Sequence, residues 1–150
     1  MFLIGRSLGG AVTTHLLTDP KVEASKLVKG VIIENTFAGI SEMADSLFPF
    51  LKLVPSLKRR MMRLNFDSLA RVQKFDSSLP VFFISGDIDT FVPTAQTIML
   101  HEKCSSKQKE LWIVPGGNHN DTWLKGMPEY AQRLQAFMKR CRGEETKKDQ

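Results

Sequence analysis

The sequence contains few of the residues that tie small secreted or metal-binding proteins together. It has two cysteines, Cys104 and Cys141, in 150 residues. They lie far apart and without metal-ligand spacing, so they do not make a disulfide framework and we expect two free thiols. The three histidines also lack zinc spacing. These absences argue against a metal site, and we expect no metal.

Long apolar runs and a strong net charge are missing as well. No apolar stretch approaches the roughly eighteen residues of a membrane span, and no signal peptide precedes the first predicted strand. The formal charge of +5 is mild, and the basic cluster at 58–63 has no interleaved aromatic residues, which argues against nucleic-acid binding. That cluster is either a solvated helix face or a contact with an anionic membrane surface. We expect the chain itself to be soluble.

Four short runs of apolar and β-branched residues alternate with helical patterns. The predicted strands are residues 1–5, 29–35, 79–86 and 109–117. Apolar residues at three- and four-residue spacing predict helices after Ser7, after Pro93 and from Pro128 to Gly143. This alternation is typical of an α/β fold with a mainly parallel sheet of about four strands and flanking helices. We expect one domain over residues 1–142.

In the first predicted helix the residues at this spacing are Leu8, Ala11, Val12, His15 and Leu16. In the two other helices the spacing also predicts the face that turns inward. For the second helix the inward residues are Ala95, Ile98 and Met99. For the last they are Tyr130, Leu134, Phe137, Met138 and Cys141.

Two segments interrupt this order. Residues 36–66 carry two prolines and several helical fragments, so we expect a helical insertion. It is either packed over the sheet or forms a lid above an apolar pocket, and the sequence leaves both interpretations open. Residues 143–150 are predicted to be a disordered, charged tail.

The stretch "GRSLGG" at 5–10 places a serine between a predicted strand and a predicted helix. A G-x-S-x-G pattern in that context gives a turn so tight that Gly5 and Gly9 avoid collisions and the hydroxyl of Ser7 is exposed. The N–H of Leu8 would then point to where an oxyanion forms. The alternative interpretation is a serine that caps a helix.

Candidate partners for Ser7 follow in the order acid, then base. Asp87 and Asp89 come after the third predicted strand, and His119 comes after the fourth, behind two glycines. Order and placement are those of a Ser-His-Asp arrangement in which the histidine activates the serine. The other two histidines lie on predicted helices, and we expect them to be structural or solvent-facing.

Four stretches resemble the α/β-hydrolase superfamily and, more narrowly, its branch named alpha/beta hydrolase domain-containing protein 13. They are "GRSLGGAV" (5–12), "IIENTF" (32–37), "FISGDIDTFVP" (83–93) and "GGNHNDTW" (116–123). The resemblance places the acid at Asp89 rather than Asp87. It implies a cofactor-free serine hydrolase acting on an acyl ester or thioester, such as an acyl-protein or lipid-like substrate. It also implies membrane association through an N-terminal anchor.

The resemblance also predicts that the chain is the C-terminal portion of such a fold. In that fold the serine-bearing strand lies in the middle of the sheet, whereas here it opens the chain. We therefore expect reduced or no activity of the chain alone, because a second oxyanion donor comes from an earlier loop. The alternative function is a non-catalytic fragment that binds a partner chain or a membrane surface through its open sheet edge.

Overall fold

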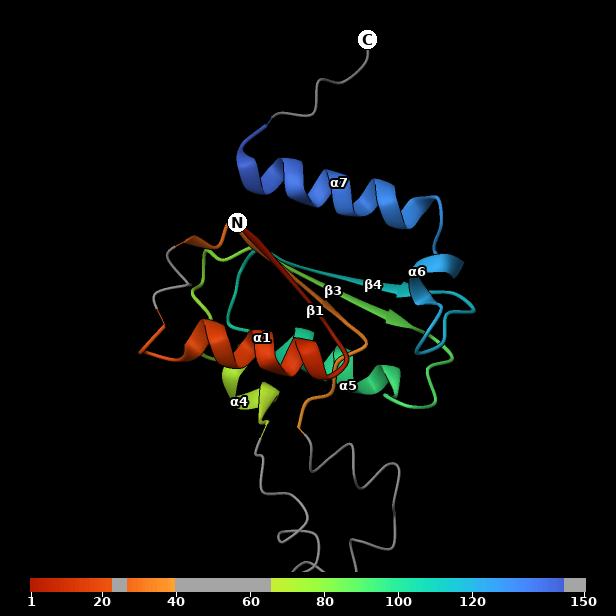
Figure 1. Ribbon diagram of the computed structural model, residues 1–150, viewed down its shortest axis with the longest axis horizontal. Helices are drawn as coiled ribbons and strands as arrows, with labels where there is room; N and C mark the ends of the chain where they lie inside the picture. The colour runs from red at the N-terminus through yellow and green to blue at the C-terminus, as the bar shows by residue number, and fades with distance from the viewer. Residues whose placement is uncertain (23–26, 40–65, 145–150) are drawn as a thin grey trace, which may run out of the picture.

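The computed structural model describes residues 1–22, 27–39 and 66–144 (Figure 1). The strands are β1 (Phe2–Arg6), β2 (Gly30–Glu34), β3 (Val81–Gly86) and β4 (Lys109–Val114). The helices are α1 (Leu8–Thr18), α4 (Ser68–Val72), α5 (Thr94–Lys103), α6 (Thr122–Lys125) and α7 (Glu129–Arg142). Most of the predicted insertion at 36–66 and of the predicted tail lies outside the described residues.

The four strands form one parallel sheet in the order β1-β2-β3-β4. This confirms the predicted α/β class and the mainly parallel sheet. All four strands lie within the predicted runs or extend them by a residue. The last strand ends at Val114, three residues before the predicted end, because Pro115 has no N–H to donate and Gly116 takes a positive φ of 70°.

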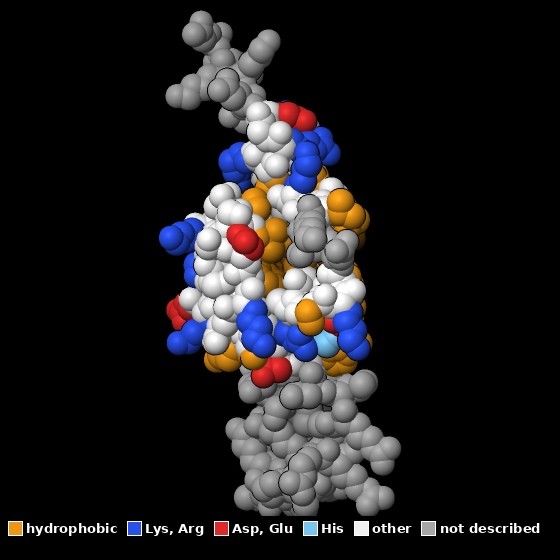
Figure 2. All heavy atoms as spheres, turned by 90° about the vertical axis from the view of Figure 1, so that its left-hand side faces the viewer, with side chains coloured by type: hydrophobic (Ala, Val, Ile, Leu, Met, Phe, Trp, Pro, Cys, Tyr) orange, Lys and Arg blue, Asp and Glu red, His pale blue; other side chains and the backbone are white. Residues whose placement is uncertain are grey.

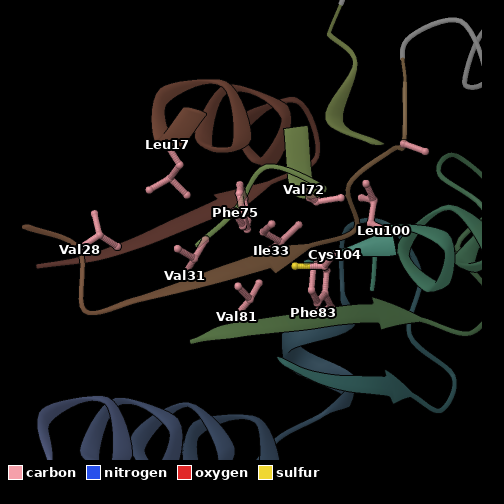
Figure 3. Packing of buried hydrophobic residues seen from close by; sticks show 11 residues of the cluster. Leu17, Val28, Val31, Ile33, Val72, Phe75, Val81, Phe83, Leu100 and Cys104 are labelled. Carbon is pink, nitrogen blue, oxygen red and sulfur yellow. The ribbon is translucent and has the colours of Figure 1, made fainter. Parts of the chain in front are cut away.

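Alternating side chains of the two central strands enter two separate cores. Every residue of β2 and β3 is buried, as expected for parallel strands covered on both faces. Val31, Ile33 and Phe83 point toward α1, α4 and α5 (Figure 3). Ile32 and Phe82 point to the other face, which α7 covers (Figure 1).

Helix α7 packs as predicted. The side chains that face the sheet are Phe137, fully buried, with Tyr130, Leu134, Met138 and Cys141 partly buried around it. The ring of Phe137 lies 5.6 Å from that of Phe82. The helix ends at Gly143, which adopts the left-handed conformation typical of a helix stop.

Helix α1 forms where the spacing predicts a helix, but most of the apolar residues that predict it are not on its buried face. Leu8 and Val12 are 50% and 49% exposed, and the buried residues are Gly10, Ala11, Thr13, Thr14 and Leu17. Small side chains face inward because the helix approaches the neighbouring backbone closely. A Cβ on Gly10 would overlap the side chain of Thr36, with only 2.8 Å to its Cβ.

Helix α5 departs from its predicted face in a similar way. Ala95 and Met99 are exposed, and the buried positions include Gln96 and Thr97. The Oε1 atom of Gln96 accepts a hydrogen bond from the N–H of Ala38, and the hydroxyl of Thr97 donates to the carbonyl of Thr36. Helix α5 therefore turns polar side chains inward, because the backbone N–H and C=O groups of the segment after β2 need hydrogen-bond partners.

A hollow of about 540 Å³ opens at the amino ends of the strands. Figure 2 shows this side of the molecule, with hydrophobic side chains along its middle and Lys and Arg side chains around them. The residues that line the hollow include Val28, Pro80, Arg140 and Cys141. Ser7, Asp89 and His119 all lie at or beyond the carboxyl ends of the strands, so this hollow is remote from them.

Candidate active site

Ser7 occupies a strained turn between β1 and α1. Its φ is 52° and its ψ is −124°, a conformation that is rare for any residue other than glycine. The turn is held by the N–H of Ser7, which donates to the carbonyl of Glu34 at 2.9 Å, and by the N–H of Gly10, which donates to the carbonyl of Ser7 at 3.1 Å. The Ser7 side chain makes no capping hydrogen bond to α1. The alternative interpretation, a serine that caps the helix, is therefore wrong.

The two predicted elbow glycines differ in how tightly they are packed. A Cβ on Gly5 would lie 2.5 Å from Thr13 Oγ1 and 2.6 Å from the Cα of Gly10. A Cβ on Gly9 would meet nothing within 4 Å. The steric reason predicted for Gly9 is thus wrong, and the second position that has no room for a side chain is Gly10.

His119 joins Ser7 to Asp89. Its Nε2 lies 3.0 Å from Ser7 Oγ, and its Nδ1 lies 2.8 Å from Asp89 Oδ2. The other oxygen of Asp89 accepts the N–H groups of Phe91 and Val92 at 2.9 and 2.8 Å. A carboxylate has no proton to give, so Nδ1–H donates to Asp89 and Nε2 is left to accept from Ser7.

Burial favours this hydrogen-bonded row. The side chain of Asp89 is fully buried and that of His119 is 16% exposed, so water competes little for these contacts. Ser7 is partly exposed, which leaves its hydroxyl reachable from outside. Helix α1 begins at Leu8, so its first N–H groups, which have no partners within the helix, lie beside Ser7.

The remaining candidates lie apart from this row. Asp87 is exposed, and its Oδ1 accepts the N–H of Gly116 at 2.7 Å, which supports the turn after β4. His15 is exposed on α1 and approaches Asp19 to 3.9 Å. His101 lies on α5, edge-on to the ring of Phe83. The structure thus brings Ser7, Asp89 and His119 together and leaves the alternatives outside.

The loop that carries His119 has its own internal bonds. Asn118 Oδ1 accepts the N–H groups of Asn120 and Asp121, and the N–H of Asn118 donates to Asp121 Oδ1. The hydroxyl of Thr122 donates to the carbonyl of Asn118 at 2.6 Å. These contacts set the shape of the loop at the start of α6.

Sequence reasoning missed a polar cluster beside the row. Arg6 and Asn35 both donate to the carbonyl oxygen of His119. Arg6 also approaches Glu34 Oε1 to 3.7 Å, and the hydroxyl of Tyr130 donates to Glu34 Oε2. Burial, followed by the hydrogen bond to Glu34, raises the pKa of Tyr130 far above its usual range, so it stays a donor. A sequence signal for this cluster was available: two polar residues directly follow a buried strand, at the edge of the sheet where Ser7 lies.

Apolar side chains border the row on its open side. Leu8, next to Ser7, is 50% exposed, and Phe91 is 46% exposed with its ring centroid 4.9 Å from that of His119. Within the described ranges no three His, Cys, Asp or Glu side chains gather as metal ligands would. In the same part of the chain, no helix has both the length and the hydropathy to cross a membrane.

Comparison with curated proteins gives relatives at 34% identity. Over 160 residues the chain is similar to alpha/beta hydrolase domain-containing protein WAV2 of Arabidopsis thaliana, with 98% of this chain and 49% of that protein covered. Over 120 residues it is similar to Protein bem46 of Schizosaccharomyces pombe, with 80% and 38% covered. The chain spans about half or less of the length of the curated relatives it matches. No family model matches it.

Solved structures share the fold at lower identity. The esterase Pf2001 of Pyrococcus furiosus superposes with a TM-score of 0.66 at 20% identity, covering 93% of this chain and 52% of that one. A soluble variant of monoglyceride lipase from Saccharomyces cerevisiae gives 0.64 at 16%, covering 92% and 61%. The arrangement of strands and helices around Ser7 is therefore one that larger proteins contain as a part.

Proposed function

The chain belongs to the α/β-hydrolase superfamily, and on that premise we propose that it carries the reaction centre of a serine hydrolase for carboxylic esters or thioesters. The observation that carries the proposal is the hydrogen-bonded row of Ser7, His119 and Asp89, with contacts of 3.0 and 2.8 Å. A serine whose hydroxyl bonds a histidine, itself oriented by a third group, is the geometry of an activated nucleophile.

The reaction proceeds in two halves. Ser7 Oγ attacks the substrate carbonyl carbon while His119 Nε2 takes its proton, and Asp89 stabilises the imidazolium through Nδ1–H. The oxyanion accepts a hydrogen bond from the N–H of Leu8, at the positive end of α1. His119 then protonates the departing alcohol or thiol, leaving an acyl group on Ser7. A water molecule, deprotonated by the same imidazole, releases the acid and restores the serine.

The apolar border supports a substrate with an apolar acyl group. Leu8 and Phe91 flank the hydroxyl and the imidazole and are about half exposed, so an alkyl chain would cover them when bound. Burying apolar surface yields roughly 25 cal/mol per Å². The names of the two structural neighbours, an esterase and a monoglyceride lipase, support an ester bond as the first substrate to test.

A fluorophosphonate probe on the purified chain tests the proposal. We expect labelling of Ser7, located by mass spectrometry, to be slow and to reach stoichiometry on prolonged incubation, in keeping with the reduced activity expected of the chain alone, and we expect none in Ser7→Ala. Ser78→Ala is the matched control, because Ser78 is exposed and remote from His119, and it should label like the wild type. Labelling that is equal in wild type and Ser7→Ala contradicts the proposal.

Substrate class is then measured directly. A series of p-nitrophenyl esters from acetate to palmitate, with the matching thioesters, gives kcat/KM against chain length. We expect kcat/KM to rise with chain length up to the length that the apolar border covers. A flat profile contradicts the assignment of an apolar acyl group.

A further inference from the structure

The carbonyl oxygen of His119 is held by two side chains from two different strands. Asn35, directly after β2, donates to it from Nδ2 at 3.2 Å. Arg6, the last residue of β1, donates to it from its guanidinium group. A carbonyl has two lone pairs, so both acceptor positions of this atom are used by donors outside its own loop.

Asn35 uses both the nitrogen and the oxygen of its side-chain amide in hydrogen bonds. It is completely buried, and its φ of 46° lies in the left-handed region that asparagine tolerates better than most side chains. Its Nδ2 donates both to the His119 carbonyl and to Thr122 Oγ1, at 2.9 Å. Its Oδ1 accepts the N–H of Gly86 at 3.1 Å. One amide therefore joins the ends of β2 and β3 to the loop of His119.

Arg6 is held in place by a second set of contacts. Its Nε lies 3.7 Å from Glu34 Oε1, and the carboxylate of Glu34 is fixed on its other side by Tyr130 of α7. The guanidinium also reaches Asn120 Oδ1 at 3.4 Å. Because Arg6 directly precedes Ser7, this donor ties the histidine loop to the strand that presents the serine.

The hydrogen bonds within the loop of His119 cannot place that loop relative to Ser7. Those of Asn118 fix the shape of residues 118–122, and the N–H of Ile88 donates to Gly117 at 3.0 Å. They connect the loop to itself and to the end of β3, on the side of Asp89. Placement relative to Ser7 requires contacts with the ends of β1 and β2, which Arg6 and Asn35 supply.

We propose that Asn35, together with Arg6, is a positioning residue that sets where the imidazole of His119 lies between Ser7 and Asp89. The inference rests on the proposed function for its kinetic consequence only, since the placement itself is a property of the folded chain. Asn35 is completely buried, so it acts through His119 and not by contact with substrate. A displacement of about 1 Å between reacting groups is enough to slow a reaction about a hundredfold, so loss of these donors slows the step at Ser7.

Two substitutions at position 35 separate donation from packing. Asn35→Asp keeps the shape and the acceptor for Gly86 but replaces the donating Nδ2 with an oxygen that faces the His119 carbonyl. Asn35→Gly removes the side chain and tolerates the positive φ. Gln96→Ala is the matched control: it also deletes a buried amide bonded to backbone, but the bond is to Ala38 and not to His119. Unfolding by urea shows how much stability each variant loses.

Two readouts are taken on each folded variant. The first is the downfield ¹H NMR signal of the His119 Nδ1 proton, assigned by its loss in His119→Gln. The second is the rate of fluorophosphonate labelling at Ser7. We expect both substitutions at position 35 to shift or broaden the proton signal and to slow labelling at least about tenfold. Gln96→Ala should change neither. Arg6→Met, at a partly exposed position, should act in the same direction and carries the test if neither position-35 variant folds.

The outcomes distinguish this inference from the proposed function. An unchanged proton signal and labelling rate in Asn35→Gly and Arg6→Met overturns the positioning role, whatever Ser7 does. Equal losses in Gln96→Ala also overturn it, because they would reduce the effect to general stability. If Ser7→Ala labels like the wild type, the proposed function fails, while the proton signal still decides the placement of His119.

Discussion

Ser7 adopts a backbone conformation that most residues avoid, and its neighbours hold it there. Sparsely populated conformations of this kind cost about 1–3 kcal/mol and persist where the surrounding structure fixes them. The bonds from Ser7 N to Glu34 and from Gly10 N to Ser7 supply that restraint. As a result the partly exposed hydroxyl of Ser7 makes no capping bond to α1 and, among the described residues, bonds the imidazole of His119 alone.

Glycines 9 and 10 should respond differently to the same substitution. Gly10→Ala places a Cβ into the side chain of Thr36, so we expect a loss of about 1–3 kcal/mol in the free energy of unfolding. Gly9→Ala meets open space within α1, so we expect no loss and a gain of up to about 1 kcal/mol. Urea unfolding followed by circular dichroism compares the two. Equal losses would show that space around the helix start does not decide the outcome.

The two aspartates after β3 allow a matched test of orientation. In Asp89→Asn the remaining Oδ1 still accepts from Phe91 and Val92, but the amide now donates to His119 Nδ1. The imidazole proton then moves to Nε2, which can no longer accept from Ser7. We expect labelling by the fluorophosphonate to slow by up to about 10⁴-fold, the size of the corresponding effect in a serine protease.

Asp87→Asn is the control for that measurement. Within the described residues the side chain of Asp87 bonds the N–H of Gly116 alone, and an asparagine retains that acceptor, so labelling should stay within a few-fold of the wild type. A similar loss in both variants would contradict the assignment of Asp89 as the partner of His119.

At the scale of single elements, the helix faces show what spacing can predict. The face of α7 was predicted correctly because large apolar residues fill the space above Phe82 and Trp112. The face of α5 was predicted wrongly, because the backbone of residues 36–38 selected polar residues instead. In α1 a close backbone approach at Gly10 places small residues inward. Periodicity reports where apolar residues lie and does not report which neighbour needs a hydrogen bond.

Helix α5 also carries a titrating group with a structural effect. Burial lowers the pKa of His101, the nearby Lys109 of β4 lowers it further, and Glu102 opposes them. In the unfolded chain the pKa of a histidine is about 6.5, so as the pH falls through that value His101 binds a proton more readily in the unfolded chain than in the folded one. Stability accordingly falls as the pH drops below about 6.5.

Replacing His101 should weaken the dependence of stability on pH. We expect His101→Gln to lose less unfolding free energy than the wild type between pH 7.5 and pH 5.5, measured by urea titration at both values. The other two histidines are common to both proteins and cancel in the difference. An equal or larger fall in the variant would contradict the role of His101.

At the scale of the whole molecule, the sheet has an apolar edge. Within the described residues β1 pairs with β2 alone, and Ile4 on that strand is 61% exposed. Open, apolar edge strands favour pairing with other chains. We expect Ile4→Lys to reduce concentration-dependent association in light scattering. Leu27→Lys, which removes an equally exposed apolar side chain outside the strands, should have the smaller effect; the reverse order would contradict edge pairing.

Local and long-range features differ in how far sequence reveals them. Four strands, their parallel arrangement and the superfamily follow from short stretches, and the relatives and neighbours confirm them. The narrower branch and the membrane anchor stay predictions. The sequence places Arg6 and Asn35 near the ends of predicted strands, but it does not show that both bond the His119 carbonyl, because a hydrogen bond across 113 or 84 positions leaves no local pattern.

The separation of 112 positions between the serine hydroxyl and the imidazole has a kinetic meaning. A chain that has only collapsed, or that has paired its first three strands, carries an ordinary hydroxyl with no base beside it. On the proposed function, Ser7 becomes reactive when β4 docks and delivers the loop behind it, and such non-local pairing is slow. The rate at which probe labelling recovers after dilution from denaturant therefore measures how fast β4 joins the sheet.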